Sequence, residues 1–295
     1  MLLKDGTFVV AEVGLAHMGK TKLAEWLIDE LGQADAVKFQ VYTTEDLIDE
    51  TRDPVRFKRF KERELTYHQV AHLKSYAESH GLKWFASAHT MDWIKILEDL
   101  NVFAFKIGSG ERDSSALIDF AIQTGKPVLI STGLRNHHQA LATLKRFQKK
   151  QVVILHTVTQ YPTESPNLNF IHTLKQENLT MGFNVRGSLG AAESVMCEIG
   201  YSCHAVGYLP CILATAMGAT VIEKHVKHPE SVGQDGAGAL YPDEFNDMVD
   251  EIQDVEEMLG SFTRENNEEE RKNESWALKG KDGKRPYLSA GLTGT

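Results

Sequence analysis

Short apolar runs alternate with longer amphipathic segments along most of this 295-residue chain. The first pair is Phe8–Val13 followed by Thr21–Leu31, and the last is Val221–His225 followed by Pro242–Leu259. Near-continuous apolar runs are typical of strands buried on both faces of a parallel sheet, whereas apolar residues at three- and four-residue spacing indicate helices. Eight strand-then-helix units therefore predict an α/β fold, the (β/α)8 TIM barrel.

The alternative is a doubly wound open sheet, and the first strand argues against it. The glycine-rich motif G-x-G-x-x-G, which follows the first strand in dinucleotide-binding sheets, is absent after Gly14. Two connections look irregular. The polar stretch Tyr42–Glu64 is long for a barrel loop and could cover the site. The region Phe170–Val195 is expected to hold one helix and an extra loop around Asn184–Gly190.

The barrel domain is expected to span residues 1–262, because the composition changes beyond Gly260. The segment Arg264–Glu274 is a charged run, and Trp276–Thr295 is rich in glycine and lysine. Residues 263–295 are too few to bury a core of their own, so a tail is expected there.

Composition limits the partners and the compartment. A net charge of -9 argues against nucleic acid, which needs a basic face, but it leaves room for an anionic substrate in a locally basic cleft. No apolar run approaches the roughly 20 residues that span a bilayer, and the first residues have no signal-peptide profile. Three cysteines are too few for a disulfide framework, which favours the reducing cytoplasm. Together these observations predict a cytoplasmic protein without membrane association.

Charged and polar residues occupy the predicted carboxyl ends of the strands, where a purely structural barrel would have valine, isoleucine and alanine. Side chains at these ends converge on the active site of a barrel. They are Glu12, Lys38, Gln40, His89, Lys106, Ser109, Glu111, Ser131, Thr132, Tyr161, His204, Glu223 and His225. The sequence therefore predicts a polar site at this end of the barrel.

Lys38 and Lys106 each interrupt an apolar run, and lysine is almost never buried without a partner. One interpretation is an internal ion pair with Glu12 or Glu223. A second is a pair of ammonium groups that hold a phosphate or carboxylate, and a third is a Schiff-base lysine. The hydroxyls expected nearby, Ser109, Ser131 and Thr132, favour anion binding.

Two histidines, His204 and His225, end neighbouring predicted strands, so their imidazoles could share one metal ion. With oxygen ligands added, such a pair suits Mn²⁺, Fe²⁺, Co²⁺ or Zn²⁺. Adjacent strand residues point to opposite faces, so Cys203 is expected to pack away from the site. Glu12 is interpreted either as a base or water-orienting group, or as the partner of a lysine.

The order of these segments resembles the sialic acid synthases, the NeuB-like enzymes. The similarity extends over Phe8 to about Leu259, and its segments follow the family order. They are Ala11–Gly14 with His17, Val37–Gln40, Phe105–Glu111, Pro127–Gly133, Tyr161-Pro162 with Asn167-Leu168, Gly200–Ser202 with His204, and Glu223–His225.

The resemblance implies a transferase of carbohydrate biosynthesis that condenses phosphoenolpyruvate with the open-chain aldehyde of an N-acylated, N-acetylmannosamine-like sugar. The products would be a nine-carbon, sialic-acid-like 2-keto acid and phosphate. It implies metal ligation by His204 and His225, with Mn²⁺ expected and Mg²⁺ or Co²⁺ as alternatives. The implied catalytic carboxylates are Glu12, Glu111 and Glu223. The implied substrate-binding residues are Lys38, Gln40, Lys106, Ser109, Ser131, Thr132, Tyr161, Asn167, Ser202 and Asp235.

The chain departs from the family pattern at several points. It has Ala16 before His17 in place of asparagine, Cys203 in place of aspartate, and Gly236 in place of histidine. The usual C-terminal antifreeze-like domain, which completes the partner subunit's site in a homodimer, is not expected within residues 263–295. Two alternatives stay open: a related synthase with a different acceptor, such as a phosphorylated sugar, or a non-catalytic barrel that needs a partner module. A basic cluster for an acceptor phosphate would favour the phosphorylated acceptor, and none is evident in the sequence.

Overall fold

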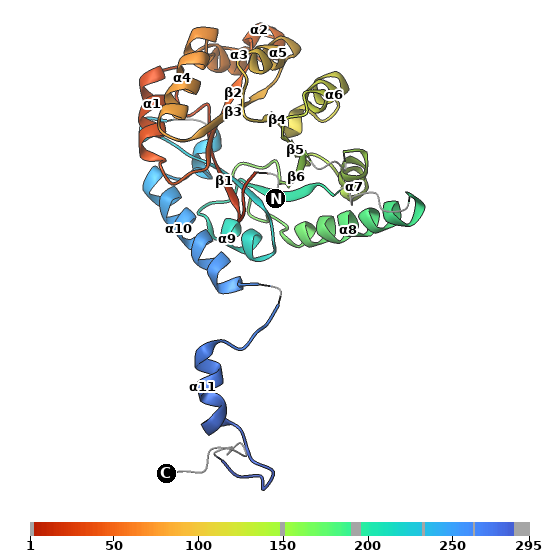
Figure 1. The fold of residues 1–295 in the computed structure, drawn as a ribbon. Coiled ribbons are helices and arrows are strands. Elements are labelled where there is room, and N and C mark those ends of the chain that lie inside the picture. The colour runs from red at the N-terminus through yellow and green to blue at the C-terminus, as the bar shows by residue number, and fades with distance from the viewer. Residues whose placement is uncertain (1–2, 148–150, 190–195, 232–233, 262, 286–295) are drawn as a thin grey trace. The chain divides into compact units, whose positions relative to one another are not determined.

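Parallel strands, each hydrogen-bonded to the next in chain order, close into a barrel in the computed structural model (Figure 1). The structure describes residues 3–147, 151–189, 196–231, 234–261 and 263–285. The strands of this barrel are β1 (Phe8–Gly14), β2 (Ala36–Val41), β3 (Lys83–Ala88), β4 (Phe105–Ile107), β5 (Val128–Ser131), β6 (Val152–His156), β7 (Glu198–Cys203) and β8 (Val221–His225). The predicted (β/α)8 barrel is confirmed.

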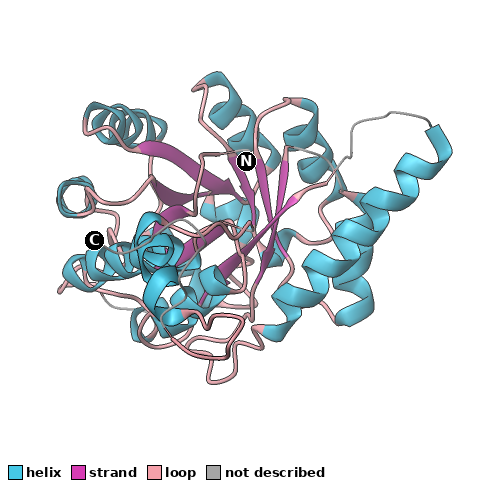
Figure 2. Ribbon diagram, turned by 60° about the horizontal axis from the view of Figure 1, so that its bottom comes forward, coloured by secondary structure: helices cyan, strands magenta, loops and turns pink. Residues whose placement is uncertain are grey.

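A helix follows each strand, and the helices surround the barrel on the outside (Figure 2). In strand order they are α1 (Thr21–Glu30), α4 (Tyr67–Ser79), α5 (Met91–Asp99), α6 (Ser115–Gln123), α7 (His137–Arg146), α8 (Asn169–Leu189), α9 (Leu209–Ala216) and α10 (Pro242–Leu259). Shorter helical segments in the connections are α2 (Thr44–Leu47), α3 (Pro54–Lys61), η1 (Ser109–Glu111) and η2 (Gln234–Ala237). Local sequence fixes some helix starts: Thr66 and Gln69 form a capping box before α4.

The core has two layers that follow from the alternation of side chains along each strand. Val37 and Phe39 of β2 belong to the outer cluster between strands and helices, whereas Lys38 between them points into the barrel. A second cluster fills the interior around the amino-terminal parts of the strands, with Phe8 and Phe85 among its buried members. This apolar plug leaves only the carboxyl ends of the strands available for a polar site.

Two predicted segments differ from the structure. The extra loop expected around Asn184–Gly190 is wrong as far as the described residues reach, because α8 continues to Leu189. This segment has no proline, and its glycines and asparagine each lower helix propensity by only about 1 kcal/mol or less. The polar stretch Tyr42–Glu64 is not a plain loop, since it contains α2 and α3.

The chain divides into two compact units, Met1–Met258 and Leu259–Thr295. The second contains the helix α11 (Glu268–Ala277), which begins with a capping box formed by Asn267 and Glu270. The predicted domain boundary at residues 262 and 263 stays a prediction. Among the described residues, no helix combines the length and apolar character needed to cross a membrane.

Gly200 provides a test of the packing inside the barrel. It pairs with Leu155 across β6 and β7, and a Cβ at this position would lie 2.6 Å from Leu155 Cδ2 and 2.7 Å from the Val221 carbonyl oxygen. We expect Gly200→Ala to lower the free energy of unfolding by about 1–3 kcal/mol, because an extra methyl in a filled interior forces its neighbours apart. Urea unfolding followed by circular dichroism measures this.

Gly32→Ala is the matched control, since a Cβ added at Gly32 would meet no atom within 4 Å. Its stability should stay close to that of the wild type or rise slightly. Equal unfolding free energies for the two variants would contradict the packing described for β7.

Candidate active site

A cavity of about 710 Å³ lies at the carboxyl ends of the strands. Many of the residues that line it were predicted from the sequence, and they come from strands that are far apart in the chain. The predicted residues that line it are Glu12, Lys38, Gln40, His89, Lys106, Ser109, Glu111, Ser131, Tyr161, Ser202, His204, Glu223 and His225.

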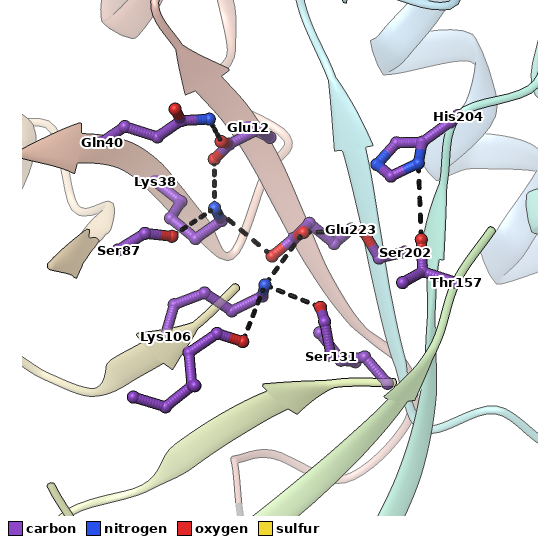
Figure 3. Close-up of polar contacts among 12 residues, drawn as sticks. Glu12, Lys38, Gln40, Ser87, Lys106, Ser131, Thr157, Ser202, His204 and Glu223 are labelled. Carbon is purple, nitrogen blue, oxygen red and sulfur yellow. Dashed lines mark hydrogen bonds and ion pairs between the residues drawn. The ribbon is translucent and has the colours of Figure 1, made fainter. Parts of the chain in front are cut away.

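Lys38 lies at the centre of a buried network of charges (Figure 3). Its Nζ is 2.6 Å from Glu12 Oε2 and 3.6 Å from Glu223 Oε2, and it donates a 3.2 Å hydrogen bond to Ser87 Oγ. Gln40 Nε2 donates to the other oxygen of Glu12 at 2.9 Å. The network therefore connects β1, β2, β3 and β8. Of the interpretations left open for Lys38, the internal ion pair is present in the structure.

Lys106 occupies the neighbouring position but has a weaker ionic partner. Its Nζ donates to Ser131 Oγ at 2.8 Å, whereas the nearest carboxylate oxygen, Glu223 Oε1, is 3.8 Å away (Figure 3). Ser202 Oγ donates to that same carboxylate oxygen at 2.8 Å. Glu223 thus shares its charge between two lysines and a hydroxyl.

The electrostatics differ between the two lysines. Burial alone would lower the pKa of Lys38, but the carboxylates of Glu12 and Glu223 outweigh burial and raise it above its ordinary value. For Lys106 burial prevails, and its pKa is lowered despite the attraction of Glu223. Burial would raise the pKa of Glu223, yet Lys106 and Lys38 hold it well below its usual range. An anion that entered beside Lys106 would supply the counter-charge which this ammonium lacks.

His204 and His225 lie next to each other at the ends of β7 and β8, with ring centroids 5.5 Å apart. Burial, followed by the neighbouring His225, lowers the pKa of His204 to about 3, so its ring is neutral at pH 7. Its Nδ1 lies 2.7 Å from the Val158 carbonyl oxygen and must carry the proton there, because the carbonyl can only accept. The ring's Nε2 therefore keeps its lone pair, as a metal ligand requires.

The donor set for a metal at this pair is small. Within the described residues, no group of three or more histidine, cysteine, aspartate or glutamate side chains could hold a metal ion. Two imidazoles fit a cation only if water or substrate oxygens complete its coordination. Cys203 does not contribute: its sulfur accepts from Lys224 Nζ at 3.4 Å and belongs to the outer core, as strand alternation predicted.

A pair formed by an imidazole and a carboxylate lies in the same cavity. His89 Nδ1, just beyond β3, is 2.6 Å from Glu111 Oε1 in η1. Burial would raise the pKa of Glu111, but the bond to His89 prevails and lowers it. The sequence placed His89 at a strand end without giving it a role, so this pair was missed although both residues were noted.

Two predicted binding residues do not line the cavity. The Thr132 hydroxyl donates to the Leu155 carbonyl oxygen at 3.0 Å and is occupied by the barrel wall. Asn167 is exposed, in a left-handed conformation with φ of 48°, and it is not among the lining residues. Asp235 belongs to η2, but its side chain lies outside the described part of the structure.

The cavity is also lined by residues that the sequence patterns did not single out. Ser87, Thr157 and Thr159 contribute hydroxyls, and Ser87 could have been found because it lies two residues after the inward-facing Phe85. Arg56, Arg59 and Arg63 line it as well. The stretch Tyr42–Glu64, which was expected to cover the site, thus supplies part of the cavity wall through α3 and the residues after it.

Comparison with known proteins gives consistent similarities. A family model described as the NeuB family matches residues 30–264. An uncharacterized protein of Methanocaldococcus jannaschii is 36% identical over 265 residues, covering 87% of this chain and 73% of the relative. The N,N'-diacetyllegionaminic acid synthase of Legionella pneumophila is 30% identical over 279 residues, covering 86% of this chain and 73% of its own length.

A solved structure has the same fold over nearly its whole length. The N-acetylneuraminic acid (sialic acid) synthetase of Leptospira borgpetersenii superposes with a TM-score of 0.79 at 26% sequence identity. The superposition covers 91% of this chain and 90% of that one.

The network around Lys38 leads to a stability prediction. Lys38→Met leaves buried carboxylates short of a cation, so we expect the free energy of unfolding to fall by about 3–5 kcal/mol at pH 7. Lys22→Met is the control, because Lys22 pairs with Glu25 at 2.6 Å while its side chain is 90% exposed. A surface pair of this kind contributes about 0–1 kcal/mol.

The effect of Lys38→Met should depend on pH. The pKa of Glu223 is lower in the folded protein than in the unfolded chain, so its ionised carboxylate stabilises the folded state. This stabilisation is complete above the unfolded pKa of about 4.3 and is lost as the pH falls through the folded pKa. The difference between wild type and variant should therefore shrink below about pH 4. Urea unfolding across this range measures it, and a difference that grows on acidification would contradict the network.

Proposed function

Because the chain belongs to the NeuB family, we propose that it joins phosphoenolpyruvate to the open-chain aldehyde of an amino sugar, giving a 2-keto sugar acid and phosphate. The family resemblance and the enzyme class predicted from the sequence are confirmed, since the named relatives are synthases. The observation that carries the proposal is one cavity that contains both a buried lysine pair and a histidine pair. Lysines suit an anionic donor, and imidazole nitrogens suit a metal that binds a carbonyl acceptor.

The donor would bind at the lysine pair. Lys106 has a hydroxyl partner in Ser131 and a distant carboxylate, so a phosphate or carboxylate group can approach its ammonium without displacing a close ion pair. Ser109 and Ser202 bring two more hydroxyls to the same cavity. Charge-assisted hydrogen bonds of this type are short and directional, and would fix the donor's orientation.

The acceptor's carbonyl would lie toward the histidine pair. A divalent metal such as Mn²⁺, held by His204 and His225, would act there as a Lewis acid on the aldehyde. The chain itself sets the ligand geometry: Val158 fixes the tautomer of His204, and the ring of Tyr161 packs on it with centroids 4.1 Å apart. The restricted ring positions would favour one placement of the acceptor.

Proton transfer is assigned to the carboxylates. The new carbon–carbon bond converts the aldehyde oxygen into an alkoxide, which takes up a proton to become a hydroxyl. Water adds to the carbon that carries the phosphate, loses its protons and supplies the new carbonyl oxygen as the bond to phosphate breaks. Glu12 lines the same cavity and is held by Lys38 and Gln40. The Glu111–His89 pair lines it as well. A positioned acid or base of this kind contributes about 10²–10⁴-fold to a rate.

Phosphate release provides the direct test of the proposed function. Purified protein is incubated with phosphoenolpyruvate, with and without a panel of amino-sugar aldehydes and with and without Mn²⁺, and free phosphate is measured. We expect release only when donor, aldehyde and metal are all present. Release that is independent of the aldehyde, or none with any member of the panel, would overturn the proposal.

The histidine pair can be tested separately by metal binding. His204→Ala and His225→Ala each remove one of two imidazole ligands, so we expect Mn²⁺ affinity to fall by at least about tenfold in each. Electron paramagnetic resonance of free Mn²⁺ measures the bound fraction without any need for turnover. His172→Ala is the control, because His172 is exposed on α8. Unchanged Mn²⁺ binding in both site variants would remove the assignment.

A further inference from the structure

Three arginines from the connection between β2 and α4 line the same cavity as the lysine and histidine pairs. Arg56 and Arg59 belong to α3, and Arg63 follows its end. Spacings of three and four residues place side chains on one face of a helical segment. The wall of the cavity formed by this segment is therefore strongly cationic.

The basic residues of this segment differ in their ionic partners. Within the part of the chain that the structure describes, Arg56 and Arg59 form no ion pair with a carboxylate; their guanidinium carbons lie 5.2 and 5.7 Å from the ring centroid of Phe60. Lys61 on the same helix is different, since it pairs with Glu45 at 2.9 Å and with Glu64 at 3.1 Å.

Two further features distinguish this wall from an ordinary solvated helix face. Arg63 is only 8% exposed, so one of the three guanidinium groups is largely withdrawn from bulk water. Asp53 also lines the cavity, but its carboxylate accepts from the backbone of Arg56 at 3.0 Å as the cap of α3. A chain with a net charge of -9 thus concentrates positive charge at this wall.

The arginines belong to a different element from Lys38 and Lys106, so the cavity has two cationic regions. Phosphoenolpyruvate is small, and under the proposed function its two anionic groups bind at the lysine pair and the nearby hydroxyls. The second region is then available to the other substrate. Guanidinium groups present a planar fork of donors that matches phosphate oxygens, and their charge suits a dianion.

We propose that the acceptor is a phosphorylated amino sugar whose phosphate monoester is bound by Arg56, Arg59 and Arg63. This inference rests on the proposed condensation with phosphoenolpyruvate and narrows its acceptor. The arginines form a basic cluster of the kind that a phosphorylated acceptor needs and that was not evident in the sequence. The cluster is hidden in the sequence because glutamates at 62 and 64 alternate with the basic residues.

The test compares N-acetylmannosamine with N-acetylmannosamine 6-phosphate at saturating phosphoenolpyruvate and Mn²⁺. We expect kcat/KM to be at least about tenfold higher for the phosphate ester, since one charge-assisted hydrogen bond alone is equivalent to about that factor. Arg59→Gln should reduce this ratio by about tenfold, mainly through KM for the phosphorylated sugar. Lys58→Gln is the matched control, because Lys58 is exposed on the same helix and does not line the cavity.

Each outcome bears on the inference. Equal or better use of the unphosphorylated sugar, or a ratio that Arg59→Gln leaves unchanged, would overturn it. If no acceptor supports turnover, the proposed function fails, and calorimetric titration of the 6-phosphate then decides this inference alone. Binding that weakens about tenfold in Arg59→Gln but not in Lys58→Gln supports the arginine site, and equal binding to all three proteins contradicts it.

Discussion

The mutual neutralisation of two lysines and two glutamates inside the barrel is the interaction on which the site depends. Lys38 lies 2.6 Å from Glu12, and Glu223 lies between Lys38 and Lys106. Removing four such charges from water would be prohibitive if they were unpaired. The parallel register places Glu12 opposite Lys38, so the fold itself brings these opposite charges together. The positive charge of Lys106 is only partly neutralised by these carboxylates, so this end of the network is suited to an incoming anion.

The surrounding structure divides the cavity into three chemical regions. The apolar plug around Phe8 and Phe85 closes the interior below the charges and confines polar groups to the carboxyl ends of the strands. The imidazoles of His204 and His225 lie at the ends of β7 and β8. Figure 3 shows His204 on the other side of Glu223 from Lys38 and Lys106. The basic face of α3 forms a third region. A donor, a carbonyl and a second anionic group can thus be held at separate places in one cavity.

The barrel and the centre of the site could be predicted from the sequence, because both depend on short-range patterns. The alternation of apolar and amphipathic runs predicts the strands and helices. A lysine within an apolar run, as at Lys38, is expected to be buried only with a partner. The rest depends on tertiary geometry. Thr132 is adjacent to the inward-facing Ser131, yet its hydroxyl bonds to the neighbouring strand. The His89–Glu111 pair and the arginine face depend on how connections fold over the barrel, which no strand or helix periodicity specifies.

The mass of the product formed from phosphoenolpyruvate and a mixture of phosphorylated and unphosphorylated amino-sugar aldehydes tests the central claim most directly. The account predicts a product equal to one acceptor plus the elements of pyruvate, with one phosphate released per product, and it predicts that the phosphorylated acceptor is the one consumed. Free pyruvate with no acceptor-derived product, or a product that retains the phosphate of phosphoenolpyruvate, would contradict it.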